Sequence, residues 1–477
     1  MKEKIAEYTS ILQVLLKSKE AIAVGAEVAL LIVCTIFSLF TGIFKTLPAI
    51  LLSAMVITIL FLITKWLTEN YVDKANRKKL YIGTAITSVI GLIAYIVIVY
   101  NREFEYLSDH VVYYQLQSEL ASVFNLSPIK GLYAIVSSCW NSDYSYFINV
   151  VLALPFTFTT GSNNSFVITY YVALIIPVCY MNNLFVLNIA QKLKVENVNL
   201  VAVLGNIVFL TFPLLHYASI LGMPDIFGMF FVFGIVVIMM NYDFAEFSLS
   251  KSIIASILVL FLVVSRRWYI FTLIGLFSVI IAIKFIYGFL NKDKTLGKKT
   301  FFGEVKFIAV TAVVMLATLA PFIYKTLFVK DYSTDYSEYN FGGLPYEITN
   351  QMGFSGILTL VILFVGLVYG LINKNLRQLT LISLLGYAVT IYSYTTIQNM
   401  GKHQLLCLAI YYLILIYNTF ILIDKIKLKP LKYALAVVIV AVFLLNTFST
   451  ITGYINEENG VYLLTKYAVS ARFTWSF

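Results

Sequence analysis

The sequence predicts an all-α, polytopic membrane protein. Of its 477 residues, 60% are apolar and only 12% are charged, whereas soluble globular chains average about 25% charged and about 45–50% apolar residues. Apolar runs recur from near residue 20 to near residue 450, and most approach the roughly 20 residues that a helix needs to cross a hydrocarbon core. This composition excludes a soluble enzyme, a nucleic-acid-binding protein and a disulfide-stapled secreted domain.

The apolar runs predict roughly 13 transmembrane helices, because each is a candidate span by length and hydropathy. The run 252–264 is short, so its helix must tilt, thin the bilayer or be covered by its neighbours. The predicted spans, in chain order, are 22–41, 47–66, 80–100, 166–190, 198–220, 226–240, 252–264, 270–290, 304–322, 355–373, 377–397, 403–423 and 432–452.

The basic residues predict the orientation of these spans. Clusters of Lys and Arg at 74–79, 292–299, 374–377 and 425–429 fall on one side together with the N-terminus. Cytoplasmic loops carry an excess of Lys and Arg, so we expect a cytoplasmic N-terminus and an external C-terminal tail in a cell membrane. The net charge of +10 then reflects cytoplasmic loops. Heavy use of Ile, Lys, Asn, Tyr and Phe is typical of an AT-rich bacterial genome.

Whether the segment 147–160 crosses the membrane determines on which side every later loop lies. It is apolar but short for a span, and it contains Pro155. If it crossed, the basic cluster at 292–299 would be external, so we expect a re-entrant or interface-lying helix instead. Residues 101–165 then form one long external loop with membrane-lying helices, and 323–352 form a second. Loops of this length are usually functional or disordered.

Charged residues are sparse on the external side, so each acid there is informative. Asp109 opens the run SDHVVYYQLQSELASVF, whose spacing predicts a helix with Asp109, Tyr113 and Glu119 on its polar side. One interpretation is an N-cap at Ser108 or Asp109. The other is a carboxylate held at the membrane surface as a general base, or as a metal ligand, for an incoming hydroxyl.

Two further acids are expected at external helix ends. Asp143 lies in WNSDYSYF, just before the predicted re-entrant helix, and Asp225 follows Pro224 at the start of an apolar run. Each alone is more often a helix cap than a catalytic residue. Three lone carboxylates at external helix ends together favour a site.

The adjacent arginines Arg266 and Arg267 interrupt an apolar stretch at the predicted external face. Intramembrane Arg costs about 2.5–3.5 kcal/mol at mid-bilayer, so one interpretation is snorkelling to the outer headgroups. We prefer an anion site, since the planar guanidinium matches phosphate oxygens. Lys402 and His403, at the external start of another helix, could converge on the same anion.

The remaining polar and sulfur-containing residues give weaker signals. The three histidines and the absence of CxxC or HxxxH spacing disfavour a dedicated metal cage. Glu27 lies in the first span and is a functional candidate by position, or it snorkels to the cytoplasmic interface. We interpret the four cysteines as packing residues: Cys34, Cys139, Cys179 and Cys407.

Five landmarks, each a short motif between about residues 80 and 425, follow one another in an order, and on predicted sides of the membrane, that resemble those of the GT-C superfamily of membrane glycosyltransferases. The resemblance is to the branch with protein O-mannosyltransferases and the lipid-A aminoarabinose transferase in particular. The landmarks are an acidic loop motif (Asp109-His110 with Tyr113-Tyr114), a juxtamembrane stretch (Asp143 to Phe147), an external acid (Met223-Pro224-Asp225), a basic pair (Arg266-Arg267) and a late helix start (Lys402 to Leu406).

This resemblance implies a GT-C-like catalytic core over 80–425, preceded by two additional spans in 1–79 and followed by a last span and external tail in 426–477. It implies transfer of a sugar from a polyprenyl-phosphate carrier to an external acceptor: a cell-envelope glycan, teichoic acid, lipid or protein. Such a donor needs no nucleotide site, which fits the absence of a P-loop or GxGxxG motif.

The resemblance also implies roles for individual residues. Catalytic roles fall to Asp109, which would deprotonate or orient the acceptor, to Asp225 and to Asp143. No cofactor is required, although Asp109 or Asp225 could ligate a divalent metal. The implied substrate-binding residues are Arg266, Arg267, Tyr269, Lys402, His403, Tyr113, Tyr114 and His110.

Two other functions remain open. A polysaccharide polymerase or ligase would also have external loops and arginines, but it would transfer a whole glycan from a lipid pyrophosphate. A transporter or flippase of lipid-linked glycans should show internal repeats, broken helices and charges near the membrane midplane. We find no convincing repeat, and apart from Glu27 the polar groups gather at the predicted external face.

Overall fold

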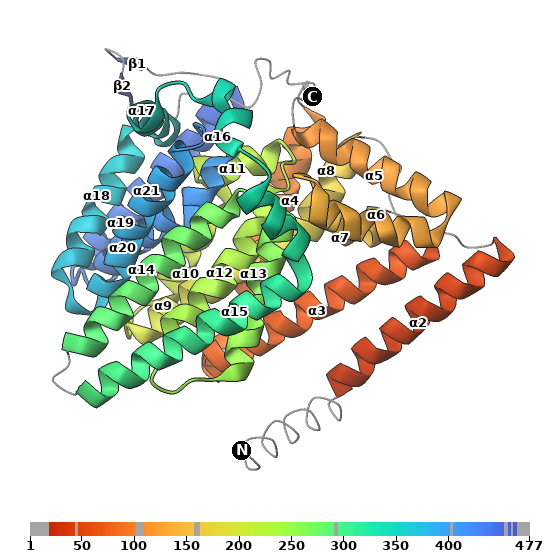
Figure 1. Cartoon of the computed structure of the whole chain (residues 1–477). Coiled ribbons are helices and arrows are strands. Elements are labelled where there is room, and N and C mark those ends of the chain that lie inside the picture. The colour runs from red at the N-terminus through yellow and green to blue at the C-terminus, as the bar shows by residue number, and fades with distance from the viewer. Residues whose placement is uncertain are drawn as a thin grey trace. The chain divides into compact units, whose positions relative to one another are not determined.

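The computed structural model describes residues 19–42, 46–101, 109–156, 163–290, 294–400, 404–452, 457–458 and 461–464. Within these residues the chain is almost entirely helical, apart from the two-residue antiparallel strands β1 (Glu457–Glu458) and β2 (Val461–Tyr462). An all-helical fold is therefore confirmed for the part of the chain that is described (Figure 1).

The chain divides into two compact units, 1–66 with 112–169 and 67–111 with 170–477. The first contains α2 (Lys19–Thr41), most of α3 (Leu47–Tyr71), most of α5 (Asp109–Leu126), α6 (Pro128–Asn141), α7 (Phe147–Phe156) and all but the last residue of α8 (Asn163–Tyr170). The second contains α4 (Lys74–Tyr100), the π-helix η1 (Tyr171–Ile175), α9 (Ile176–Lys192), α10 (Val198–Thr211), α11 (Pro213–Ile220), α12 (Asp225–Asn241), α13 (Leu249–Ser265), α14 (Tyr269–Leu290), α15 (Lys294–Phe328), α16 (Tyr332–Asp335), the 3₁₀ helix η2 (Ser337–Tyr339), α17 (Gly343–Ser355), α18 (Ile357–Ile372), α19 (Lys374–Thr395), the 3₁₀ helix η3 (Gln404–Leu408), α20 (Ala409–Asp424) and α21 (Lys429–Thr452).

Helices fill most of the described residues in the ranges predicted as spans, and the range 198–220 holds two helices, α10 and α11, bent by 50°. Eight helices of the described chain are long and apolar enough to cross a membrane, or up to 10 if each of two bent pairs is one span. Large apolar side chains such as Phe40, Phe61 and Val313 are more than half exposed, as expected of surfaces that face lipid. The protein is therefore a helical membrane protein, and the full number of crossings stays a prediction.

In the first unit, the described part of the predicted external loop 101–165 is mostly helical. The ten residues of α7 rise about 15 Å, which is half of the roughly 30 Å hydrocarbon core, so α7 cannot cross it. Asn149 on α7 donates hydrogen bonds to the backbone oxygen of Tyr113 (2.9 Å) and to Gln117 Oε1 (3.1 Å). These buried bonds fasten α7 to α5.

One expectation about α5 is wrong. We placed Tyr113 on its polar side, but the Tyr113 side chain is only 1% exposed. Gln117, Leu120 and Phe124, which share its face at helical spacing, are also buried. This face packs inward because a tyrosine ring carries more apolar surface than its single hydroxyl offsets, and Glu119 remains on the exposed side.

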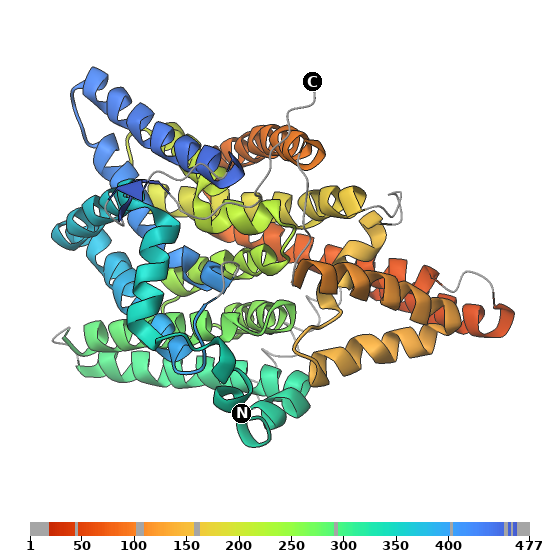
Figure 2. The same cartoon turned by 90° about the horizontal axis from the view of Figure 1, so that it is seen from above.

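In the second unit, α12 is the central helix, and nearly all of its residues from Asp225 to Met239 are buried. It packs against α9 and α13, and it is apolar on every side, as a fully enclosed helix requires. At the periphery α14 and α15 lie side by side, as Figures 1 and 2 both show. The helix α15 extends beyond the predicted span 304–322 and is kinked at Leu319, two residues before Pro321, because proline cannot donate the helical hydrogen bond.

Candidate functional site

Three helix ends meet at Asp225 and Arg266 in the second unit. Asp225 is the first residue of α12, and Arg266 follows the last residue of α13 with an extended backbone. The Arg266 Nε donates to Asp225 Oδ1 at 2.7 Å, and the two side chains are 3% and 2% exposed. A carboxylate at a helix N-terminus complements the helix dipole, so Asp225 is held by both its own helix and the guanidinium.

Tyr269 holds the same junction from the third helix, α14. Its hydroxyl donates to the backbone oxygen of Asp225 at 2.7 Å, and its ring is buried against Gly228. A Cβ at position 228 would come within 2.1 Å of that ring, so the close approach requires glycine there. Tyr269 is therefore packed beneath Asp225, where it fixes the start of α12.

Arg267 points to a different partner. Its guanidinium lies over the ring of Phe322, 3.8 Å from the centroid, and Nη1 donates to the backbone oxygen of Val263 at 3.4 Å. Phe322 lies just beyond the kink of α15. The next residue, Trp268, contacts the rings of Tyr336 and Tyr394, so aromatic side chains adjoin the charged groups.

The ion pair leaves one oxygen of Asp225 without a partner. Among the described residues Oδ2 has no hydrogen bond, although it is fully buried. A buried carboxylate oxygen normally has a donor, and an unmet one costs about 1–3 kcal/mol. This oxygen is therefore placed to accept a hydrogen bond from a hydroxyl.

Part of the motif from Lys402 to Leu406 lies near the junction that contains Asp225 and Arg266. Lys402 and His403 lie outside the described residues, but η3 begins directly after them at Gln404. This 3₁₀ helix packs against α12 and α14, and Thr272 on α14 donates to the backbone oxygen of Cys407 at 2.8 Å. The structure thus brings three landmarks, far apart in the chain, to one junction.

The other two landmarks fall on α5 and on the turn between α6 and α7. α5 begins at Asp109, as predicted for a helix start, while the side chains of Asp109 and His110 lie outside the described residues. Asp143 is half-buried in the turn between α6 and α7. The neighbouring Tyr144 packs edge-to-face on Tyr113, with ring centroids 5.8 Å apart, so the two motifs of the first predicted loop meet.

Tyr114 lies apart from that contact. Its ring packs edge-to-face on Phe166 of α8, with centroids 5.4 Å apart, and it is half-buried. Tyr113 and Tyr114 therefore serve different interfaces of the first unit.

Sequence analysis missed a buried acid in the second predicted loop. Glu347 on α17 is completely buried and accepts hydrogen bonds from the Met400 backbone N–H (2.8 Å), Gln351 Nε2 (3.1 Å) and Asn399 Nδ2 (3.4 Å). Burial raises the pKa of the Glu347 carboxyl above its ordinary value, against the lowering effect of these donors. The signal was the Glu–Gln pair at i and i+4, a spacing that places both on one helix face.

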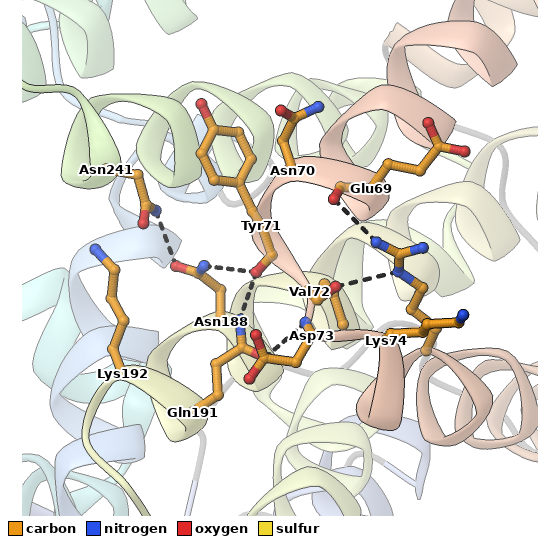
Figure 3. A pocket seen from close by; sticks show the side chains of 11 residues that line it. Glu69, Asn70, Tyr71, Val72, Asp73, Lys74, Asn188, Gln191, Lys192 and Asn241 are labelled. Atoms are coloured by element: carbon orange, nitrogen blue, oxygen red, sulfur yellow. Dashed lines mark hydrogen bonds between the residues drawn. The ribbon is translucent and has the colours of Figure 1, made fainter.

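A polar pocket of about 290 Å³ lies at the opposite end of α12, where Asn241 lines it. In Figure 3 the amides of Asn188 and Gln191 point at the backbone oxygen of Tyr71, with bonds of 2.8 and 2.6 Å. Arg77 in the same pocket donates to two backbone oxygens. These bonds satisfy the end of α3, which favours a structural role for this pocket.

Among the described residues, no group of three or more His, Cys, Asp or Glu side chains is placed to hold a metal ion. The four cysteines form no disulfide. Comparison of the chain with protein-family models, with characterised proteins and with solved structures finds no match.

Proposed function

We propose that this chain is an integral-membrane glycosyltransferase of the GT-C kind. It would transfer a sugar from a polyprenyl-phosphate carrier to an extracytoplasmic acceptor, namely a cell-envelope glycan, teichoic acid, lipid or protein. The proposal includes about 13 crossings of the plasma membrane, a cytoplasmic N-terminus and an external C-terminal tail. The observation that carries it is the buried Asp225–Arg266 pair with Arg267 directly beside it in the chain.

The net charge of Asp225, Arg266 and Arg267 is of the sign that would stabilise negative charge developing on a leaving phosphate. Two guanidiniums and one carboxylate sum to +1, and all three side chains are at most 9% exposed. Removing charges from water costs several kcal/mol per ion, which a packing role alone does not require. Preorganised cations in such a site stabilise the charge that appears on a leaving group, and Asp225 holds the Arg266 guanidinium in one orientation.

In the proposed reaction the acceptor hydroxyl gives its proton to Asp109, and its oxygen bonds to the anomeric carbon of the sugar. The bond from that carbon to the phosphate oxygen breaks, and the carrier phosphate leaves with the electron pair. Arg266 and Arg267 neutralise it. Asp143 and Asp225 would position acceptor and sugar, and contacts to substrate would come from Tyr269, Lys402, His403, Tyr113, Tyr114 and His110.

Purified protein in lipid vesicles, given a panel of polyprenyl-phosphate sugars with acceptor extracts, tests the proposal by release of the free carrier. Asp109→Asn should abolish release, and Arg267→Ala should raise the KM for the donor or lower kcat. Matched controls are Arg377→Gln and Asp243→Asn, both exposed and away from the cluster. No release by the wild-type protein with any donor, or full activity in Asp109→Asn, would contradict the proposal.

The same panel separates the two other functions. A lipid-pyrophosphate-linked oligosaccharide consumed in place of the monophosphate donors would identify a polymerase or ligase. Movement of a labelled donor across the vesicle membrane without carrier release would identify a transporter. Single cysteines test the orientation: residues near 266 should react with an impermeant reagent from outside, and residues near 295 only from inside.

A further inference from the structure

The Glu347 carboxylate links the second predicted loop to the chain just before η3. Its Oε2 accepts from the backbone N–H of Met400 (2.8 Å) and from Asn399 Nδ2 (3.4 Å), while Oε1 accepts from Gln351 Nε2 (3.1 Å). All three donors are amides. A buried carboxylate persists when several such donors point at it, and here they come from both sides of the contact.

Asn399 strengthens the link from the other side. Its Nδ2 also donates to the backbone oxygen of Gly343 (2.9 Å), and its Oδ1 accepts from the backbone N–H of Phe341 (2.7 Å). The backbone N–H of Asn399 donates to the oxygen of Tyr339 (3.1 Å). The turn that precedes α17 is therefore bonded to Asn399 at three points.

Gln351 extends the network to two further helices of the second unit. Its Oε1 accepts from the hydroxyls of Tyr387 on α19 and Tyr412 on α20, each at 2.7 Å. The later part of α17 is thus bonded to α19 and α20, and α17 is bent by 103° relative to α18. Figure 1 shows α17 lying at the end of the helices α18 to α21.

Only three residues separate Met400 from Gln404, the first residue of η3. Four Cα steps of about 3.8 Å keep these two residues within roughly 15 Å. η3 in turn packs against α12 and α14, the helices that begin at Asp225 and Tyr269. Holding Met400 in place therefore restricts where η3 can lie relative to the junction that contains the buried ion pair.

We propose that Glu347 is a positioning residue, which holds Met400 and hence η3 against the Asp225–Arg266 pair. Its role in catalysis rests on the glycosyltransferase function proposed above; its role in holding η3 does not. Loss of the carboxylate leaves the Met400 N–H buried without its acceptor, and it leaves Asn399 Nδ2 with the Gly343 oxygen alone. An unmet buried donor is unfavourable, which favours release of this segment.

Thiol reactivity of Cys407 on η3 reports the position of that helix without any substrate. Cys407 is a buried, free cysteine, so we would keep it as the sole cysteine and measure its reaction with N-ethylmaleimide. Glu347→Leu should raise the rate about tenfold or more. Glu347→Gln keeps an oxygen for Met400 and should stay near the wild-type rate. Glu338→Leu, an exposed acid of the same loop, is the matched control.

Asn399→Ala provides a second route to the same result, in case Glu347→Leu does not fold. It should also raise the Cys407 rate, because it removes the bonds to Gly343 and Phe341. Unchanged protection of Cys407 in these variants would overturn the proposal. The catalytic part is tested by transfer assays in which Glu347→Leu lowers kcat about tenfold and Glu347→Gln restores it.

The two proposals fail in different ways. A rise in Cys407 reactivity with a wild-type protein that turns over no donor keeps the positioning role and removes the glycosyltransferase function. An active wild-type protein whose kcat and Cys407 protection both survive Glu347→Leu keeps the function and removes the positioning role.

Discussion

Replacing Asp225 alone should leave the Arg266 guanidinium buried without its counter-charge. At 2.7 Å the attraction is about 6 kcal/mol for an effective dielectric constant near 20, and desolvation of both ions offsets most of it. Breaking one half of such a pair typically costs about 3–5 kcal/mol. We therefore expect Asp225→Ala and Arg266→Ala each to lower the free energy of unfolding by that amount.

The double variant Asp225→Leu/Arg266→Met separates stability from function. Because apolar side chains of similar volume often replace a buried ion pair at no net cost, the double variant should regain most of the stability that each single variant loses. It should still lack transferase activity. SDS titration in mixed micelles measures the unfolding free energies, with exposed Asp243→Ala as the control. Losses below about 1 kcal/mol in the single variants, or additive losses in the double variant, would refute a buried and energetically coupled pair.

Three further predictions concern other positions. Arg267→Ala removes the contact with Phe322 and should lower the free energy of unfolding by about 0.5–2 kcal/mol, measured by the same SDS titration. Phe322→Leu should lower it by a similar amount. An unchanged free energy of unfolding in both variants would show that the contact does not stabilise the fold. Because burial raises the pKa of Glu347, its contribution to stability is full at acidic pH and is lost as pH rises through that pKa. The melting temperature of the wild type should therefore fall as pH rises from acidic values through the pKa of Glu347, and that of Glu347→Gln should change less. The facing tyrosines Tyr387, Tyr394 and Tyr412 ordinarily titrate near pH 10, so they do not account for a change at lower pH. Melting temperatures that change equally with pH in both proteins would contradict this prediction. Gly356 has a φ of +73°, and a Cβ there would lie 2.7 Å from the Leu464 backbone, so Gly356→Ala should cost at least about 1–3 kcal/mol; an alanine variant as stable as the wild type would refute the bend geometry.

The positions of the helices could be read from the sequence because hydrophobic thickness sets a length that apolar runs must match. The start of α5 at Asp109 could be read as well, since capping depends on neighbouring residues. The inward face of α5 could not: that face packs inward where α7 is fastened to α5, through Asn149, 36 positions later, which bonds to the Tyr113 backbone. Whether a side chain with both apolar and polar parts is buried or exposed depends on the element that packs against it.

The candidate site divides in the same way. The sequence by itself marked Asp225, Arg266 and Arg267 as costly charges at helix ends. Tertiary packing decided that Asp225 and Arg266 meet across 41 residues, that Arg267 turns to Phe322, and that Glu347 binds Met400. The physical reason is that the free-energy cost of removing a charge from water can be read from one residue and the hydropathy of its neighbours in the chain. The partner that offsets this cost depends on how helices distant in the sequence pack together.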